Sequence, residues 1–180
     1  GAADSHGAIH NPEGLDVASL IRLKDQGGSV TDYVDAMRLQ SDQVIDIECD
    51  IWIPAARPDV INQSNVERLK AKLLVEAANI PVTPAAEETL YKRGVFYVPD
   101  FIANAGGVIC AAMEYQGATE AGVFAAIEEK LRRNTEIVLA AASEEGMTPR
   151  RAAIQLAGER VKKVMGYRRW SLFSSAPGFI

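Results

Sequence analysis

Short apolar runs alternate in the first part of the chain with segments in which apolar positions recur every three or four residues. The apolar runs at residues 49–53, 72–77 and 95–98 are typical of strands, and the spacing over residues 85–92 is typical of a helix. Each run is apolar on both faces, and helical patterns lie between the runs. The pattern therefore predicts a parallel sheet covered by helices.

The N-terminal residues follow this pattern less regularly. Residues 1–3 are predicted to end a strand with Asp4 at its carboxyl end, and residues 5–14 to form a loop because they are rich in turn-forming types. Apolar spacing then predicts a short helix that begins near Val17, followed by a second short helix over residues 30–38.

Helical spacing dominates the sequence after Gly107. One helix is predicted over residues 120–144 with Gly146 closing it, and another opens at Thr148-Pro149. The predicted packing face of this last helix consists of apolar residues at helical spacing: Ala153, Leu156, Ala157, Val161 and Val164.

Polar or small residues follow the predicted strands. They are Asp4, the pair Ala55-Ala56, Asn79 and Asn104. Loops that leave the carboxyl ends of parallel strands meet at one edge of the sheet and form the ligand crevice of such folds. We therefore expect these residues to line one edge of the sheet and to form a binding site.

The most informative stretch is residues 99–110, where a strand turns into a helix through Asn104-Ala105-Gly106-Gly107. Glycines lack the Cβ atoms that would block a ligand from the backbone, and a helix start presents unpaired N–H groups. The Asn104 amide can donate and accept hydrogen bonds at once. This combination predicts that a ligand approaches the backbone here.

Composition excludes several classes of protein. The 180-residue chain has a formal net charge of −5, which argues against nucleic acid as a partner. No apolar run approaches the ~20 residues of a membrane span, and the N-terminus lacks the features of a secretory signal. Cys49 and Cys110 lie in apolar segments and are expected to be buried and reduced, which indicates the cytoplasm.

Two further patterns bear on candidate chemistry. His6 and His10 stand four positions apart, but in a predicted loop without further ligands, so no metal site is predicted. The Gly-x-Gly-x-x-Gly turn that opens a dinucleotide-binding fold does not occur in this sequence. Asp4 stands where the acidic residue roughly 20 residues after such a turn would be. The chain, which begins without methionine, is therefore expected to be a cut or processed form.

Three segments carry a resemblance to a known family. They are Cys-Asp-Ile-Trp-Ile-Pro-Ala-Ala at 49–56, Glu-Ala-Ala-Asn-Ile-Pro-Val-Thr-Pro at 76–84, and Pro-Asp-Phe-Ile-Ala-Asn-Ala-Gly-Gly-Val at 99–108. With the N-terminal segments at 4–7 and 11–16, they resemble the glutamate/leucine/phenylalanine/valine dehydrogenases in order and spacing. Within that family the chain is most similar to glutamate dehydrogenases.

The resemblance implies an α/β fold with a partial Rossmann-type parallel sheet that lacks its first β-strand and glycine-rich turn, followed by C-terminal helices. It implies a partial dinucleotide-binding domain over 1–118, a helical segment of the same domain over 119–170, and a tail over 171–180. The implied activity is the oxidative deamination of L-glutamate to 2-oxoglutarate and ammonia with NAD or NADP, in a homo-oligomer.

The resemblance also assigns coenzyme contacts residue by residue. Asp4 matches the acidic residue near the adenosine ribose, and the backbone at Ala55 and Ala56 matches the part that passes the ribose groups. Asn79 matches the asparagine near the nicotinamide ribose. Asn104 matches the residue that binds the nicotinamide carboxamide, which would fix the ring face that meets the substrate.

Val108 and Ala111 match helix positions that face the substrate side chain. Glutamate-specific members often carry a hydroxyl residue where Ala111 stands, so a leucine- or valine-type dehydrogenase is the alternative substrate class. The catalytic lysine and aspartate of the family have no matching positions here. The resemblance therefore implies no catalytic residue in this polypeptide and no activity for it alone.

A non-catalytic nucleotide-binding or assembly module is the alternative from another class. For the dehydrogenase interpretation, the family sheet places the missing first strand centrally. The chain alone would then present unpaired backbone groups at that place and is expected to dimerise or aggregate through it.

Overall fold

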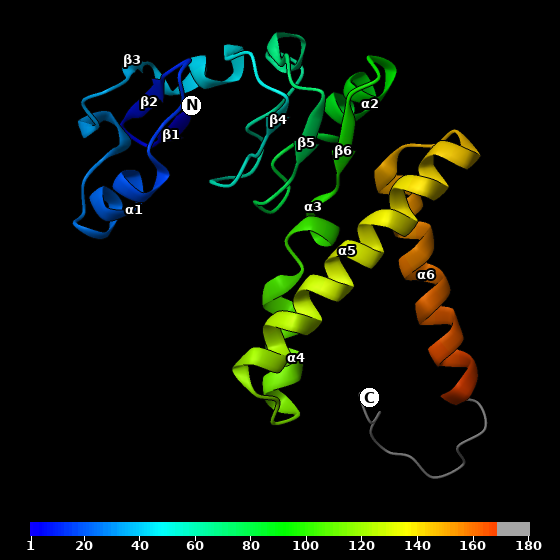
Figure 1. Cartoon of the computed structure of the whole chain (residues 1–180). Helices are drawn as coiled ribbons and strands as arrows, with labels where there is room; N and C mark the ends of the chain where they lie inside the picture. The colour runs from blue at the N-terminus through cyan, green and yellow to red at the C-terminus, as the bar shows by residue number, and fades with distance from the viewer. Residues whose placement is uncertain (169–180) are drawn as a thin grey trace. The chain divides into compact units, whose positions relative to one another are not determined.

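The computed structural model describes residues 1–168, and the predicted tail over 171–180 lies outside them. The chain forms two compact units, Gly1–Asp100 and Phe101–Ile180 (Figure 1). The first unit holds both β-sheets and the second is helical. The division of the family domain after residue 118 stays a prediction.

A small antiparallel sheet opens the first unit. It consists of β1 (Ala2–Asp4), β2 (Gly7–His10) and β3 (Met37–Leu39), in that order. Asp4 pairs with Gly7 across a tight turn, and Ile9 is fully buried against Leu20 and Val30. The prediction of a loop over residues 5–14 was therefore wrong, because the short apolar run of β2 enters a core that only the folded chain creates.

The second predicted short helix, over residues 30–38, was also wrong. Its first turn is a 3₁₀ helix, η1 (Val30–Asp32), in which the Ser29 and Asp32 side chains form a capping box. The chain then becomes extended and adds β3 to the sheet. Pairing with β2 supplies backbone hydrogen bonds that compete with continuation of the helix. The helix expected near Val17 is α1 (Val17–Asp25), with its first N–H groups bound by Asp16.

The predicted parallel sheet is confirmed. It consists of β4 (Ile51–Trp52), β5 (Leu73–Val75) and β6 (Phe96–Val98), in that order and all parallel. One face packs under α2 (Pro84–Lys92), with the side chains of Leu74, Leu90 and Tyr97 fully buried (Figure 1). The sheet therefore has the alternation of strand and helix that the sequence predicted.

One part of that prediction was wrong, because β1 does not belong to the parallel sheet. Among the strands of residues 1–168, the one that ends at Asp4 pairs with β2 alone, in an antiparallel hairpin. The 3₁₀ helix η2 (Ser41–Asp46) lies between the two sheets in sequence, and a further 3₁₀ helix, η3 (Val66–Arg68), lies between β4 and β5. Asp4 therefore does not stand at the carboxyl edge shared by β4, β5 and β6.

An exposed apolar margin marks the β4 side of the parallel sheet. Within the described chain β4 is paired with β5 alone, and the side chains of Ile51 and Ile53 are more than half exposed. Unprotected edge strands with apolar side chains favour pairing with another chain. The expectation that the chain associates through this side stays a prediction.

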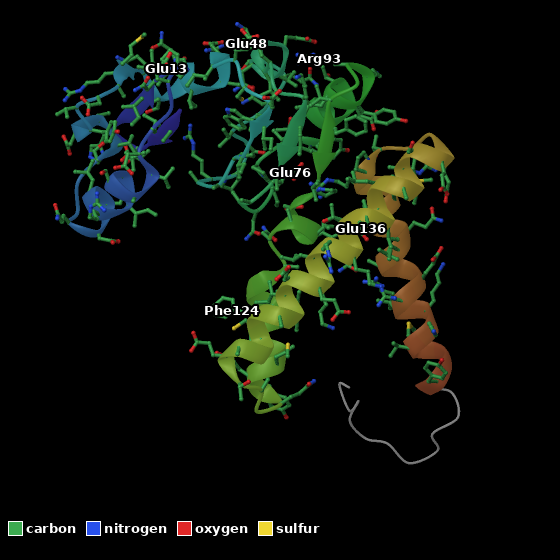
Figure 2. The ribbon with its side chains drawn as sticks, in the orientation of Figure 1. Glu13, Glu48, Glu76, Arg93, Phe124 and Glu136 are labelled. Carbon is green, nitrogen blue, oxygen red and sulfur yellow. The ribbon has the colours of Figure 1, made fainter. Side chains whose placement is uncertain are left out.

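Arg93 fastens η3 to the end of α2. Its guanidinium donates hydrogen bonds to the carbonyl oxygen of Val66 and, at 2.5 Å, to that of Leu69, and it lies 3.6 Å from Glu67. The Val66 carbonyl oxygen also accepts the N–H of Leu69 at 3.3 Å, and Leu69 is the residue that follows this single turn, so Arg93 caps its carboxyl end. Arg93 precedes β6 and Glu76 follows β5, so the two lie at opposite ends of the parallel sheet (Figure 2).

The second unit, as far as residue 168, consists of helices joined by short turns. They are α3 (Asp100–Ala103), which begins on the last residue of the first unit, α4 (Gly106–Tyr115), α5 (Glu120–Glu145) and α6 (Pro149–Arg168). Gly146 ends α5 with φ +63°, a left-handed conformation that glycine adopts without strain. Both predicted long helices are thereby confirmed.

The predicted packing face of α6 holds only in its first half. Ala153 is fully buried, whereas Val161 and Val164 are 57% and 61% exposed. Apolar spacing identifies which residues share a helix face, but whether another element covers that face depends on tertiary structure.

No helix of the described residues is both long and apolar enough to cross a membrane.

Candidate functional site

The loops that follow β4 and β5 are bonded to each other at the carboxyl edge of the parallel sheet. The carbonyl oxygen of Pro54 accepts hydrogen bonds from the backbone N–H groups of Ala77 at 3.1 Å and Ala78 at 2.8 Å. The residues that come next, Ala55 and Asn79, are both exposed. The structure therefore brings together two of the predicted site segments, 55–56 and 79.

Two buried carboxylates stand behind these loops. Glu76 follows β5 and is fully buried, and Asp100 follows β6 and is 7% exposed. The backbone N–H of Asp100 donates to Oε2 of Glu76 at 3.1 Å, and the N–H of Glu76 donates to the carbonyl oxygen of Val98 at 3.1 Å. The ends of β5 and β6 are thus joined both through backbone and through a side chain.

Asp100 also holds the loop that carries Asn79. Its Oδ2 accepts a hydrogen bond from the N–H of Ile80 at 2.8 Å, while the carbonyl oxygen of Ile80 accepts one from the N–H of Asp59 at 2.9 Å. Ile80 has φ +51°, a left-handed conformation that is rare for a β-branched residue. The chain next to Asn79 is therefore held in an unfavourable conformation by contacts on both sides.

Replacing Ile80 should stabilise the protein. The side chain is 58% exposed, so little burial is lost, and asparagine tolerates the left-handed region. Ile80→Asn is expected to raise the free energy of unfolding by about 1 kcal/mol. Urea denaturation followed by Trp52 fluorescence, in a Trp170→Phe background, measures this. A midpoint that stays unchanged or falls would show that the conformation carries no strain.

Glu76 and Asp100 received no role in the sequence-based prediction, although both lie inside the segments that carry the family resemblance. One signal was available, since each is an acidic residue at or just beyond the end of an apolar strand. The hydrogen bonds that join Asp100 to Glu76 and Ile80 connect residues at least 20 positions apart. Sequence spacing does not reveal such pairs.

Asp4 lies in a network of its own in the antiparallel sheet. Oδ1 accepts from the N–H of His6 at 3.0 Å and the hydroxyl of Ser29 at 3.1 Å. Oδ2 accepts from Nζ of Lys24 at 2.8 Å and the N–H of Val30 at 2.9 Å. Burial alone would raise the pKa of Asp4, but these four hydrogen bonds outweigh burial and hold the pKa well below its usual value.

These bonds occupy the roughly four acceptor positions of an ionised carboxylate. A ribose hydroxyl that bound Asp4 would have to share or displace one of these donors. The role of Asp4 beside the adenosine ribose stays a prediction, and the structure adds a second role, in which Asp4 joins the β1–β2 turn to α1 and η1.

The other predicted site residues lie in the second unit. Asn104 is half-buried between α3 and α4, and Val108 and Ala111 are exposed on α4, one helical turn apart. A Cβ atom built on Gly107 would meet no atom within 4 Å, and Gly107 is not among the glycines with positive φ. Neither packing nor backbone conformation within the described chain therefore requires glycine there, which leaves the start of α4 open to a ligand.

The histidines and cysteines lie apart from one another in the described chain. Among the described residues there is no group of three or more side chains that could hold a metal ion, and His6 lies in the β1–β2 turn with Ser5. Cys49 and Cys110 form no disulfide, and burial raises the pKa of both thiols. Neither cysteine has the low pKa of a reactive thiol.

The fold and its strand-end loops correspond to part of a Rossmann-type dehydrogenase domain. The hetero-hexameric glutamate dehydrogenase of Thermus thermophilus, in its leucine-bound form, superimposes with a TM-score of 0.77 and 26% identity. The match covers 94% of this chain and 41% of that one.

Sequence comparison leads to the same family. The profile of the glutamate/leucine/phenylalanine/valine dehydrogenases matches residues 1–169, and the chain belongs to this family. It is 36% identical over 179 residues to a glutamate dehydrogenase of Aeropyrum pernix, across 93% of this chain and 43% of the relative. A glutamate dehydrogenase of Thermotoga maritima is 46% identical over 113 residues, across 63% of this chain and 27% of the relative. The chain thus spans less than half the length of these relatives.

Proposed function

We propose that the protein to which this chain belongs is an NAD- or NADP-dependent amino acid dehydrogenase that acts on L-glutamate, and that this chain forms part of its coenzyme site. The single observation that carries the proposal is the junction at the Pro54 carbonyl oxygen. It places the exposed pair Ala55-Ala56 and the exposed Asn79 on neighbouring loops at the carboxyl edge of a parallel sheet. Family membership supports the reaction class.

The residues present fit a dinucleotide. Ala55 and Ala56 carry no side chain beyond Cβ, so a ribose can approach their backbone, and the Asn79 amide can donate to and accept from ribose hydroxyls. In the second unit, Asn104 would hold the nicotinamide carboxamide beside the open surface at Gly107. When bound, the nicotinamide ring supplies the hydride acceptor. The part of this chain is to bind and orient that ring.

The substrate side chain would meet Val108 and Ala111, the exposed pair on α4. Ala111 offers no hydroxyl to a γ-carboxylate, and this keeps a leucine- or valine-type substrate as the alternative. The catalytic lysine and aspartate belong to a part of the family enzymes that this sequence does not match, so we propose that this polypeptide alone is inactive. A cytoplasmic homo-oligomer is proposed with it, and the hexameric assembly of the Thermus thermophilus enzyme, which is built from unlike subunits, supports an oligomer in general.

Replacing Asn104 tests the coenzyme site. We expect Asn104→Ala to weaken binding of the reduced dinucleotide by about 10- to 100-fold, because it removes the amide that would pair with the carboxamide and leaves those polar groups unpaired. Isothermal titration with NADH and NADPH measures the dissociation constants. The matched control is Asn134→Ala in the same unit, where the lost contact is a hydrogen bond from Arg160.

Unchanged affinity in the Asn104 variant would contradict this assignment. The substrate class is decided by a second measurement on the protein of family length that contains this chain. We expect faster reductive amination of 2-oxoglutarate than of the oxo acid of leucine. The reverse order would favour the alternative, and binding without any turnover would favour the non-catalytic module.

A further inference from the structure

The backbone beside Asn79 is strained, and the strain is held from two sides. Ile80 adopts φ +51°, although its branched side chain is 58% exposed and gains little from burial. A strained residue of this kind persists only when surrounding contacts over-determine it, and such residues cluster at functional sites. The conformation of Ile80 therefore calls for a functional explanation.

The contacts that hold Ile80 come from three different strand ends. Asp100, after β6, accepts the Ile80 N–H at 2.8 Å, and Asp59, in the loop after β4, donates its N–H to the Ile80 carbonyl oxygen at 2.9 Å. Glu76, after β5, accepts the N–H of Asp100 at 3.1 Å. The peptide groups on either side of Ile80, and hence the backbone that leaves Asn79, are therefore fixed relative to the whole sheet edge.

We propose that the buried Glu76–Asp100 carboxylate pair is a positioning device that sets the direction of the Asn79 amide toward the coenzyme. The inference rests on the proposed function, because it presumes that Asn79 meets the dinucleotide. Asp100 and Glu76 are buried behind the loop and act through the backbone of residues 79 and 80. They are positioning residues and not coenzyme ligands.

The position of the pair calls for side chains that accept hydrogen bonds. A carboxylate oxygen accepts hydrogen bonds and donates none when ionised, and in both of these contacts the partner is a backbone N–H. Each N–H is thereby directed into the protein. The loop cannot turn about Ile80 without leaving a buried acceptor unsatisfied, which costs more than the hydrogen bond itself contributes.

A double-mutant cycle on dinucleotide binding tests the proposal in the full 180-residue chain. Asn79→Ala and Asp100→Ala are each expected to weaken NADH binding about 10-fold, measured by isothermal titration. If Asp100 acts through Asn79, the double variant also binds about 10-fold more weakly than the original protein. Independent effects would multiply to about 100-fold.

Three controls separate positioning from general damage. Asp100→Asn keeps an acceptor for the Ile80 N–H and should restore most of the affinity. Arg93→Ala destabilises the same unit from the opposite end of the sheet and should leave the dissociation constant unchanged. Hydrogen exchange of the Ile80 amide, measured without coenzyme, should be slow in the original protein and in Asp100→Asn, and fast in Asp100→Ala. Should alanine prevent folding, Asp100→Ser takes its place in the cycle.

The outcomes are distinct for the two proposals. The positioning role is overturned if the losses of NADH affinity in the two single variants multiply in the double variant. It is also overturned if Asp100→Ala binds NADH as well as the original protein while Asn79→Ala binds it weakly. Either result leaves the proposed function standing. If neither the chain nor the protein of family length binds any dinucleotide, the proposed function fails, and the positioning role fails with it.

Discussion

Replacing Asp4 with asparagine is expected to lower the free energy of unfolding of the first unit by about 3 kcal/mol. The substitution keeps the size of the side chain and removes its charge. One of the two acceptor oxygens becomes an NH₂ group, which must then face either the Lys24 ammonium and the Val30 N–H, or the His6 N–H and the Ser29 hydroxyl. A donor faces a donor in both orientations, so the backbone N–H of either Val30, which is buried, or His6, which is exposed, loses its partner, and the ion pair with Lys24 is lost.

The loss should depend on pH in a defined direction. The pKa of Asp4 is lowered on folding, so the unfolded chain binds the proton more tightly than the folded chain does. The contribution of Asp4 to stability is therefore fully present above the unfolded pKa of about 4 and disappears as the pH falls through the folded pKa. Urea denaturation between pH 7 and pH 2 measures this. The free energies of unfolding of the original protein and Asp4→Asn should differ most at neutral pH, and the difference should become smaller as the pH falls.

Asp16, Asp46 and Asp50 also have lowered pKa values, through hydrogen bonds from Ser19, Arg68 and Lys72 respectively. The original protein and the variant share these groups, so the difference curve isolates Asp4. Asp50→Asn is the matched control, because Asp50 pairs with Lys72 at the surface and both side chains are about four-fifths exposed. We expect little change in stability there, as for exposed ion pairs in general.

The same variant separates the two roles of Asp4. If the carboxylate stabilises the contacts between β1, α1 and η1, Asp4→Asn lowers the free energy of unfolding, and coenzyme affinity falls only in proportion to the fraction of protein that unfolds. If the carboxylate binds a ribose, coenzyme affinity falls although the protein is fully folded, and the denaturation midpoint is unchanged. An unchanged midpoint at pH 7 would contradict the first role.

Replacing Arg93 with alanine is expected to lower the free energy of unfolding by about 2–4 kcal/mol. Arg93 bonds two carbonyl oxygens, those of Val66 and Leu69, from one planar group. Val66 is fully buried and Leu69 is 1% exposed, so water does not readily replace the lost donors. The ion pair with Glu67 adds little, because the Glu67 side chain is 73% exposed.

Lysine in place of Arg93 distinguishes the geometry from the charge. An ammonium group is a point donor on a flexible stem and does not present two N–H groups in the fixed arrangement of a guanidinium. We expect Arg93→Lys to recover less than half of the loss, measured by urea denaturation, and Glu67→Gln to cost almost nothing. Full recovery by lysine would show that charge alone holds η3 and that the planar geometry of the guanidinium does not matter.

The sequence located most of the elements because their signals are local. The apolar spacing that predicted α1 and α2, and the Gly146 end of α5, each act within one or two turns of chain. The apolar runs of the parallel strands are equally local. The prediction went wrong over residues 5–14 and 30–38, where strands form only because they pair with each other and bury Ile9.

The sequence by itself therefore determined the class of fold, the family and the segments that carry the candidate site. Tertiary structure alone decided which sheet β1 joins, what the Asp4 carboxylate binds, and that Glu76 and Asp100 stand behind the Asn79 loop. The physical reason is that the fold class and the segments follow from residue spacing within a few positions. The three tertiary features depend on hydrogen bonds between residues 20 or more positions apart. Such a bond produces no periodic pattern in the sequence, because its two partners come together only in the folded chain.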